Sequence, residues 1–212
     1  MKIQTLIVLP ALLLASSLAL ADINEDLLRI QHQWATANYA TQGDEQEQAF
    51  ENLVANARTL VEINPGKAEP MVWLAIVLST DAGVTGGLGA LGKVKEARQL
   101  LQAAENINPD VLHGSVYTSL GSLYYQVPGW PISFGDDDKA REYLKLALAT
   151  NPEGIDPNYF YGDFMLEEGD YAEAVIYLEI ALQAPARLDR PLADKGRRAE
   201  VEKKLQLAKS KL

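Results

Sequence analysis

The sequence contains no cysteine and only two histidines, His32 and His113, among its 212 residues. Disulfide bonds and thiol chemistry are therefore excluded. Two histidines without a thiolate do not favour a zinc site. No serine lies in the sequence context of a nucleophile elbow, and the adjacent carboxylates Glu167 and Glu168 point to different sides of a helix. We therefore expect a protein without catalytic activity, metal or cofactor.

Basic residues are scarce through most of the chain. Residues 22–184 hold 9 Lys and Arg against 25 Asp and Glu, whereas residues 185–212 hold 9 against 4. Because an acidic body repels phosphate backbones, nucleic acid is not expected as a partner. Cationic partners are favoured instead.

The N-terminus has the pattern of a secretory signal. Lys2 precedes an apolar stretch from Leu6 to Leu20, and Ala19-Leu20-Ala21 has the small residues of a cleavage site. The alternative is an uncleaved membrane anchor, but an apolar run of about 15 residues is shorter than the ~20 that span a bilayer. We expect residues 1–21 to be a signal peptide and the mature chain to be periplasmic. No cysteine follows to carry a lipid anchor.

A spacing of small and large residues recurs four times. The pattern Ala-x3-Leu-x2-Ala-x4-Pro occurs at residues 97–109 and 140–152, and looser copies begin at Leu53 and Ala174. Alanine lets two helices approach closely, and leucine fills the space between their turns. Three copies end in Asn-Pro, which closes a helix. Each copy is therefore expected to be the second helix of a pair.

A second pattern, W-x2-L-G-x2-Y, precedes each copy. It is fullest from Tyr117 to Tyr124, with Tyr in place of Trp, and weaker from Trp34, Trp73 and Asn158. Together the two patterns resemble the tetratricopeptide-repeat (TPR) family over residues 24–185. The resemblance implies an all-α, right-handed superhelix of about four helix pairs that serves as a scaffold for protein or peptide binding. It implies no catalytic residues.

Compared with a standard TPR unit, the first three units contain 3, 8 and 7 extra residues between their two helices. These inserts are expected to emerge along one edge of the solenoid, with the two long ones as neighbours. Such inserts, together with a signal sequence, also resemble the TPR proteins associated with periplasmic TRAP-type solute transporters. That resemblance implies a ligand-binding accessory of a transporter.

The first long insert contains Gly87, Gly89, Gly92 and Lys93, in the spacing of phosphate-binding motifs. Nucleotide binding is not expected, because Val94 occupies the hydroxyl position of a P-loop and no strand precedes the glycines. We expect a flexible loop whose glycines let another segment approach closely.

The second long insert carries Trp130 and Phe134, which a flexible polar loop does not need. Two interpretations stay open: the insert packs against the glycine-rich insert, or it forms a recognition platform. Asp136 and the two aspartates after it are expected to cap the next helix, and Asp156 with Pro157 the one after that.

The concave groove of a TPR superhelix is lined by defined positions of the first helices. None of these positions is Lys or Arg in this chain. Because the basic clamp for a peptide carboxylate is missing, we expect a neutral, apolar or cationic ligand. The candidate partner-binding residues of the groove and the insert are Tyr39, Tyr125, Tyr159, Asp163, Trp130 and Phe134.

Residues 186–212 are expected to form a linker and a basic helix. Val201, Leu205, Ala208 and Leu212 lie on one stripe of that helix. We expect the stripe to cap the open end of the repeat domain, residues 22–185. The alternative is a helix that lies on an anionic membrane surface or on a partner.

The leading functional hypothesis is a non-catalytic periplasmic scaffold or adaptor that binds a protein or peptide. The accessory component of a solute transporter is the alternative, and an enzyme is the remote one.

The expected cleavage site can be tested directly. The exported protein should begin at Asp22 and be recovered in the soluble periplasmic fraction, because the apolar stretch is too short to serve as an anchor. N-terminal sequencing of the purified exported form measures this. A full-length chain in the membrane fraction would replace the signal with an anchor.

Overall fold

The computed structural model describes residues 11–212, and the side chains from residue 23 onward except that of Leu88. Within this range the chain is helical, which confirms the predicted all-α class. The helices are α1 Ala11–Tyr39, α2 Gly43–Ile63, α3 Ala68–Thr85, α4 Gly87–Ile107, α5 Val111–Gln126, α6 Asp137–Thr150, α7 Ile155–Glu167, α8 Tyr171–Gln183 and α9 Pro191–Lys209.

The predicted signal sequence lies partly outside the described residues. Its first ten residues are not described, and the remainder belongs to the beginning of α1. Among the helices that are described, none has the combination of length and hydrophobicity needed to cross a membrane.

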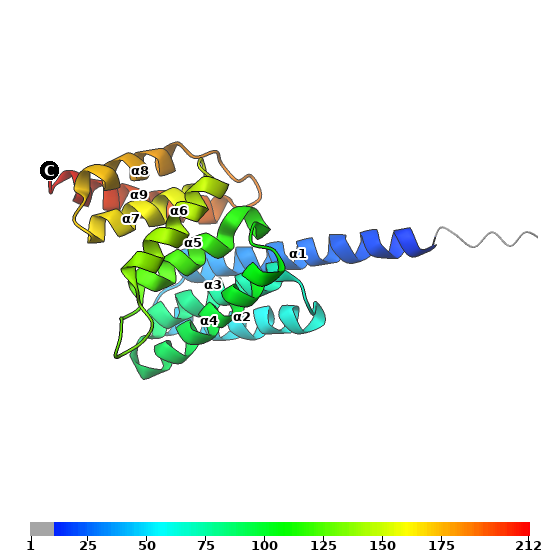
Figure 1. The fold of residues 1–212 in the computed structure, drawn as a ribbon. Helices are drawn as coiled ribbons and strands as arrows, with labels where there is room; N and C mark the ends of the chain where they lie inside the picture. Colours follow the sequence, from blue (N-terminus) through cyan, green and yellow to red (C-terminus); the bar gives the residue numbers. More distant parts are fainter. Residues whose placement is uncertain (1–10) are drawn as a thin grey trace, which may run out of the picture.

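Consecutive helices form the four expected pairs, α1 with α2, α3 with α4, α5 with α6 and α7 with α8 (Figure 1). The recurrent alanine and leucine positions lie between the helices: Ala97 and Leu101 of α4, and Ala140 and Leu144 of α6, are each 0% exposed. Burial of one such leucine contributes roughly 1.5–3 kcal/mol. The repeated spacing is therefore a packing pattern, as predicted.

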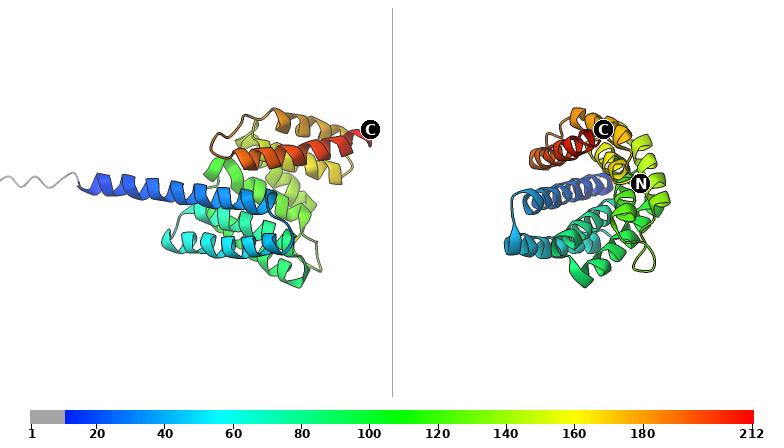
Figure 2. Two further views of the ribbon diagram at one scale, coloured as in Figure 1. Left: turned by 180° about the vertical axis from the view of Figure 1, so that it is seen from behind. Right: turned by 90° about the vertical axis from the view of Figure 1, so that its left-hand side faces the viewer.

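The odd-numbered helices form an inner layer that closes on itself. α1 packs on α3, α3 on α5, α5 on α7 and α7 on α9, and α9 in turn packs on α1. In Figure 2 the helices follow a curved path, and α1 lies with α9 on one side of it and α2 and α3 on the other. The described part of the molecule is thus a ring of five inner helices with four outer ones. The predicted TPR-like superhelix of about four helix pairs with a C-terminal helix is confirmed, and that last helix also contacts α1.

Helix α9 packs against α8 and also against α1. The guanidinium of Arg198 donates hydrogen bonds to the carbonyl oxygens of Leu182 and Ala184 at the C-terminal end of α8. At Gly196 a Cβ atom would overlap the ring of Tyr39, so the missing side chain lets α9 approach α1 closely. The expected apolar stripe is buried up to Ala208, but the prediction for Leu212 was wrong, because this residue lies beyond the helix and is 74% exposed.

The glycine-rich insert is helical, so the prediction of a flexible loop was wrong. Its residues form the beginning of α4, which follows α3 after a turn at Gly86 with a φ of 61°. A Cβ atom at Gly89 or Gly92 would meet nothing within 4 Å, so these glycines permit no close approach either. The extra residues lengthen the α3–α4 pair, whose packing outweighs the low helix propensity of glycine.

The second long insert is the α5–α6 loop, residues 127–136. Phe134 lies edge-on to Tyr124 at a centroid distance of 5.8 Å, and the guanidinium of Arg98 in α4 lies 4.1 Å from the Phe134 ring centre. Trp130 is 90% exposed, so it does not pack against the glycine-rich segment as one interpretation required. The predicted cap is confirmed, because Asp136 accepts a hydrogen bond from the Lys139 amide at 3.1 Å.

Gly121 tests the packing of α5 against α6. A Cβ atom here would lie 2.6 Å from Leu144 Cγ, so Gly121→Leu should lower the free energy of unfolding by about 1–3 kcal/mol. The same substitution at Gly92, where a Cβ atom meets nothing within 4 Å, should leave stability unchanged or slightly raised. Denaturant unfolding of both variants measures the difference, and equal stability of the two would contradict the packing described.

Candidate functional site

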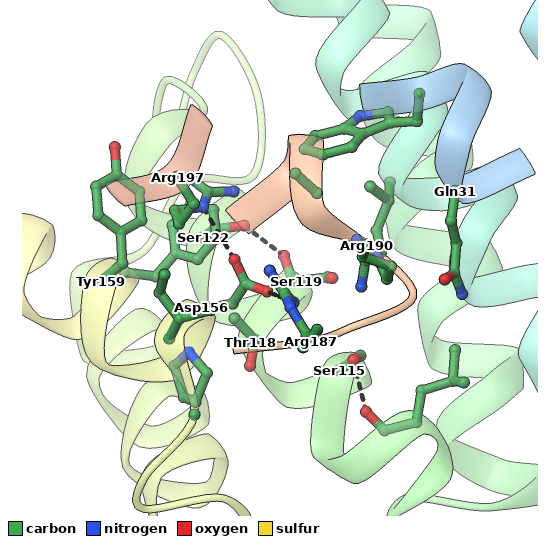
Figure 3. Close-up of a pocket in the computed structure, with 18 of the residues that line it drawn as sticks. Gln31, Ser115, Thr118, Ser119, Ser122, Asp156, Tyr159, Arg187, Arg190 and Arg197 are labelled. Atoms are coloured by element: carbon green, nitrogen blue, oxygen red, sulfur yellow. Dashed lines mark hydrogen bonds and ion pairs between the residues drawn. The ribbon is translucent and has the colours of Figure 1, made fainter. Parts of the chain in front are cut away.

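A cavity of about 890 Å³ lies inside the ring. All five inner helices contribute to its wall, together with the segment that joins α8 to α9 (Figure 3). Helices α1 and α3 contribute an apolar side, which includes Trp34, Trp73 and Ile76, whereas α5 contributes hydroxyl groups. The volume lies within the range of small-molecule sites in proteins.

Asp156, in the first turn of α7, connects two arginines at the cavity wall. One carboxylate oxygen accepts from Arg197 Nε at 2.9 Å, and the other accepts from an Arg187 Nη at 2.7 Å. Arg187 also pairs with Asp194 at 2.6 Å, and Arg197 with Glu200 at 2.6 Å. Each of these two arginines therefore has two carboxylate partners.

The predicted helix-capping role of Asp156 was wrong. Gly154 is the N-cap of α7, and the Asp156 carboxylate turns into the ring, where arginines from a distant segment reach it. Burial alone would raise the pKa of Asp156, but the guanidinium groups of Arg197 and Arg187 outweigh burial and lower that pKa to about 2.

Tyr39 and Tyr159, two of the predicted groove residues, line the cavity. The hydroxyl of Tyr39 donates to Glu200 at 3.3 Å, and burial raises the pKa of Tyr39 to about 12, so the hydroxyl stays protonated at neutral pH. Arg197 lies over the ring of Tyr159, 4.4 Å from its centre. Their role in binding stays a prediction, and their position at the wall agrees with it.

Tyr125 and Asp163, the other two groove residues, do not line the central cavity. The Tyr125 hydroxyl donates to Asp163 at 3.0 Å, and Lys204 Nζ lies 2.5 Å from the second oxygen of the Asp163 carboxylate. The Asp163 carboxylate is buried, and these contacts join α5, α7 and α9. The two residues hold the ring together at this point. Trp130 and Phe134 lie on the α5–α6 loop and are also absent from the cavity wall.

The sequence patterns did not predict the three arginines of the cavity wall, Arg187, Arg190 and Arg197. The groove positions were counted on the first helices of four pairs, whereas these arginines come from the α8–α9 segment and the fifth inner helix. The basic composition of residues 185–212 was the available signal. A preference for neutral or cationic ligands does not follow, because the cavity wall contains three guanidinium groups.

The cavity has no evident catalytic arrangement. Among the described residues, no three His, Asp or Glu side chains converge in a way that could hold a metal ion. The carboxylates of Asp156 and Glu200 are already paired with arginine, and the hydroxyl of Ser122 donates to a main-chain carbonyl of its own helix. These groups can bind and orient a ligand.

Comparison with one solved structure supports the arrangement of the helices. The crystal structure of TTC0263, a TPR protein from Thermus thermophilus, aligns with a TM-score of 0.54 and 20% identity, over 84% of this chain and 98% of the other. This chain has the TPR fold. PilF from Pseudomonas aeruginosa aligns over 88% of this chain and 89% of its own, with a TM-score of 0.35 and 20% identity.

Sequence comparison finds a TPR protein as well. A tetratricopeptide repeat and J domain-containing co-chaperone from Mycosarcoma maydis, DNJ1, is 36% identical over 76 residues, which is 36% of this chain. The chain spans 13% of the length of that protein. No protein-family profile matches the sequence.

Asp156 provides a test of the ion-pair cluster in the TPR ring. Its pKa is about 2 in the folded protein and about 3.8 for an ordinary aspartate, so its ion pairs stabilise the fold above about pH 4. This contribution is lost as the pH falls through 2. The shift corresponds to roughly 2 kcal/mol. Asp156→Asn should therefore lower the free energy of unfolding at pH 7 by about 2 kcal/mol or more, since two arginines lose their shared negative charge.

The pH dependence separates this effect from a general packing defect. Urea unfolding from pH 7 to pH 2 should show the gap between parent and Asp156→Asn narrowing below about pH 4. Glu202→Gln, at an exposed position of α9 without an ion pair among the described residues, should stay within about 0.5 kcal/mol of the parent. A gap that is independent of pH would contradict the assignment.

Proposed function

We propose that this protein is a non-catalytic scaffold of the bacterial periplasm that binds a protein partner through the tip of the α5–α6 loop. The TPR fold, which serves protein–protein interaction, supports the scaffold role. The signal-like pattern from Lys2 to Ala21 supports export. The exposed indole of Trp130 is the observation that carries the choice of surface.

The closed ring argues against the usual mode of TPR recognition. In an open superhelix an extended peptide can lie along the concave face, but here α9 contacts α1 and the inner helices surround a cavity. A long peptide cannot follow the inner face of a ring that closes in this way. A protein partner is therefore expected to dock on the outer surface.

The α5–α6 loop has the properties of a preorganised recognition element. Trp130 is 90% and Ile132 is 62% exposed, so two apolar side chains project into solvent. The base of the loop is fixed, because Gly135 N donates to Pro128 O at 3.1 Å and Asp136 N donates to Tyr124 O at 2.8 Å. An ordered loop loses little entropy on binding, and exposed tryptophan is enriched among binding hot spots.

The charges next to the loop indicate the kind of partner. Asp136, Asp137 and Asp138 follow directly after the apolar tip, and the body of the chain is strongly acidic. We therefore expect a protein with an apolar pocket for Trp130 and basic side chains at the rim of that pocket.

A second role is favoured by the cavity inside the ring. Its volume of about 890 Å³ and its mixed apolar and cationic wall fit a small ligand, as expected for an accessory component of a solute transporter. The two roles use different surfaces.

Trp130→Ala tests the docking surface. Because the side chain is 90% exposed, the variant should melt like the parent, whereas Phe134→Ala should lower the melting temperature because it removes contacts with Tyr124 and Arg98. In a pull-down from cross-linked periplasm, Trp130→Ala should lose about 2 kcal/mol or more of partner binding, which corresponds to at least about 30-fold.

Leu188→Ala is the matched control, since Leu188 is 93% exposed and lies on the α8–α9 segment. This variant should retain the partner. Equal recovery of the partner by the Trp130→Ala and parent proteins would exclude the loop as the docking surface. Loss of the partner from both Trp130→Ala and Leu188→Ala would exclude it as well.

A further inference from the structure

Arg190 differs from the other two arginines of the cavity wall. Its guanidinium carbon lies 4.9 Å from the centre of the Trp73 ring, so the side chain extends from the beginning of α9 to α3. Arg187 and Arg197 are each paired with two carboxylates, but no carboxylate of a described residue lies within 4 Å of the Arg190 guanidinium. Its Nε atom is buried and has no hydrogen-bond partner among the described residues.

Among the described residues, the Arg190 guanidinium has carboxylates near it but none in direct contact. Burial lowers the pKa of Arg190 and the like charge of Arg187 lowers it further, and together they outweigh the opposite effect of the carboxylates of Asp156, Asp194 and Asp189. Buried charges in proteins are normally paired, because an unpaired one costs several kcal/mol. The carboxylate of Asp156 is in direct contact with Arg187 and Arg197 and not with Arg190.

The surroundings of Arg190 can complete an anion site. Arg190, Gln31 and Ser119 line the same cavity (Figure 3). Ser115 also lines it, but its hydroxyl already donates to the carbonyl oxygen of Leu112 at 2.7 Å. Amide and hydroxyl groups are hydrogen-bond donors to oxyanions, and guanidinium binds a carboxylate or phosphate with two parallel hydrogen bonds.

The other side of the same space is apolar. Trp34, Trp73, Ile76 and Val84 line the cavity on α1 and α3, and Trp34 is fixed by a hydrogen bond from its Nε1 to the Thr80 hydroxyl at 3.0 Å. An apolar chain or ring attached to the anion could lie against these side chains. Exposed wall residues such as Glu153 and Pro185 lie on the α6–α7 and α8–α9 connections and give a path from solvent.

We infer that the cavity binds a small amphiphilic anion, a carboxylate or a phosphate monoester, whose oxygens contact Arg190 and whose apolar body lies against Trp34 and Trp73. The site is independent of the α5–α6 loop, so it holds whether or not that loop docks a protein. It gives the second role of the preceding section a defined ligand class.

Isothermal titration calorimetry of the mature chain tests the head group. Octanoate, monooctyl phosphate and the neutral octanamide share one apolar tail. Either or both anions should bind at least about tenfold more tightly than octanamide, because a charge-assisted bidentate contact is lost in the amide. The anion that binds more tightly shows whether the site prefers a carboxylate or a phosphate monoester. Equal affinity for octanamide, or no heat with either anion, would overturn the inference without the need for any variant.

The location of the site is tested with Arg190→Gln. The variant should bind the preferred anion at least about tenfold more weakly and should no longer distinguish it from octanamide. Arg58→Gln is the control, because Arg58 pairs with Glu96 on the outside of the molecule and does not line the cavity. It should bind like the parent. Unchanged affinity in a folded Arg190→Gln protein would exclude Arg190 as the anion contact.

Binding inside the ring has its own signal. In a Trp130→Phe background the remaining tryptophans, Trp34 and Trp73, both line the cavity. The anion that binds more tightly in the calorimetry should therefore, at saturation, change the tryptophan emission. The same anion bound elsewhere on the surface would leave that emission unchanged and overturn the assignment.

Discussion

Gly196 has no side chain at the point where α9 meets Tyr39, and this close approach brings the last inner helix onto the first. The cavity depends on that contact, because five inner helices without closure would form an open groove. The same contact brings Glu200 to Tyr39, whereas Arg197 reaches Asp156 through the packing of α9 on α7.

The uneven charge of the sequence has a use inside the fold. The basic C-terminal segment pairs with the acidic body at several places: Lys204 with Asp163 at 2.5 Å, Lys209 with Glu179 at 2.7 Å, and the arginines of the cavity with Asp156. The exposed pair of Lys209 contributes little, whereas the pairs with partly buried carboxylates fix the position of α9. The segment needs no membrane surface to explain its composition.

The helix pairs could be predicted from the sequence because their packing is local. Ala97, Leu101 and Gly121 meet side chains of the neighbouring helix, so their spacing repeats along the chain. The cavity could not be predicted in this way. The His32 Nε2 atom lies 2.6 Å from the carbonyl oxygen of Asp189, a residue 157 positions away, and no periodic pattern indicates a contact of that range. Glycine propensity likewise suggested a loop where tertiary packing forms the beginning of α4.

Ring closure also fixes the number of repeats. In an open TPR array each unit contacts only its neighbours, so units can be added or removed at an end with a nearly additive effect, and the terminal units fray first. Here the first inner helix also contacts the last, so neither terminal unit is bordered on one side only. The unfolding of any one pair removes contacts on both of its sides, which couples the whole ring into one cooperative unit. An array with one pair more or one pair fewer would place α9 out of reach of α1.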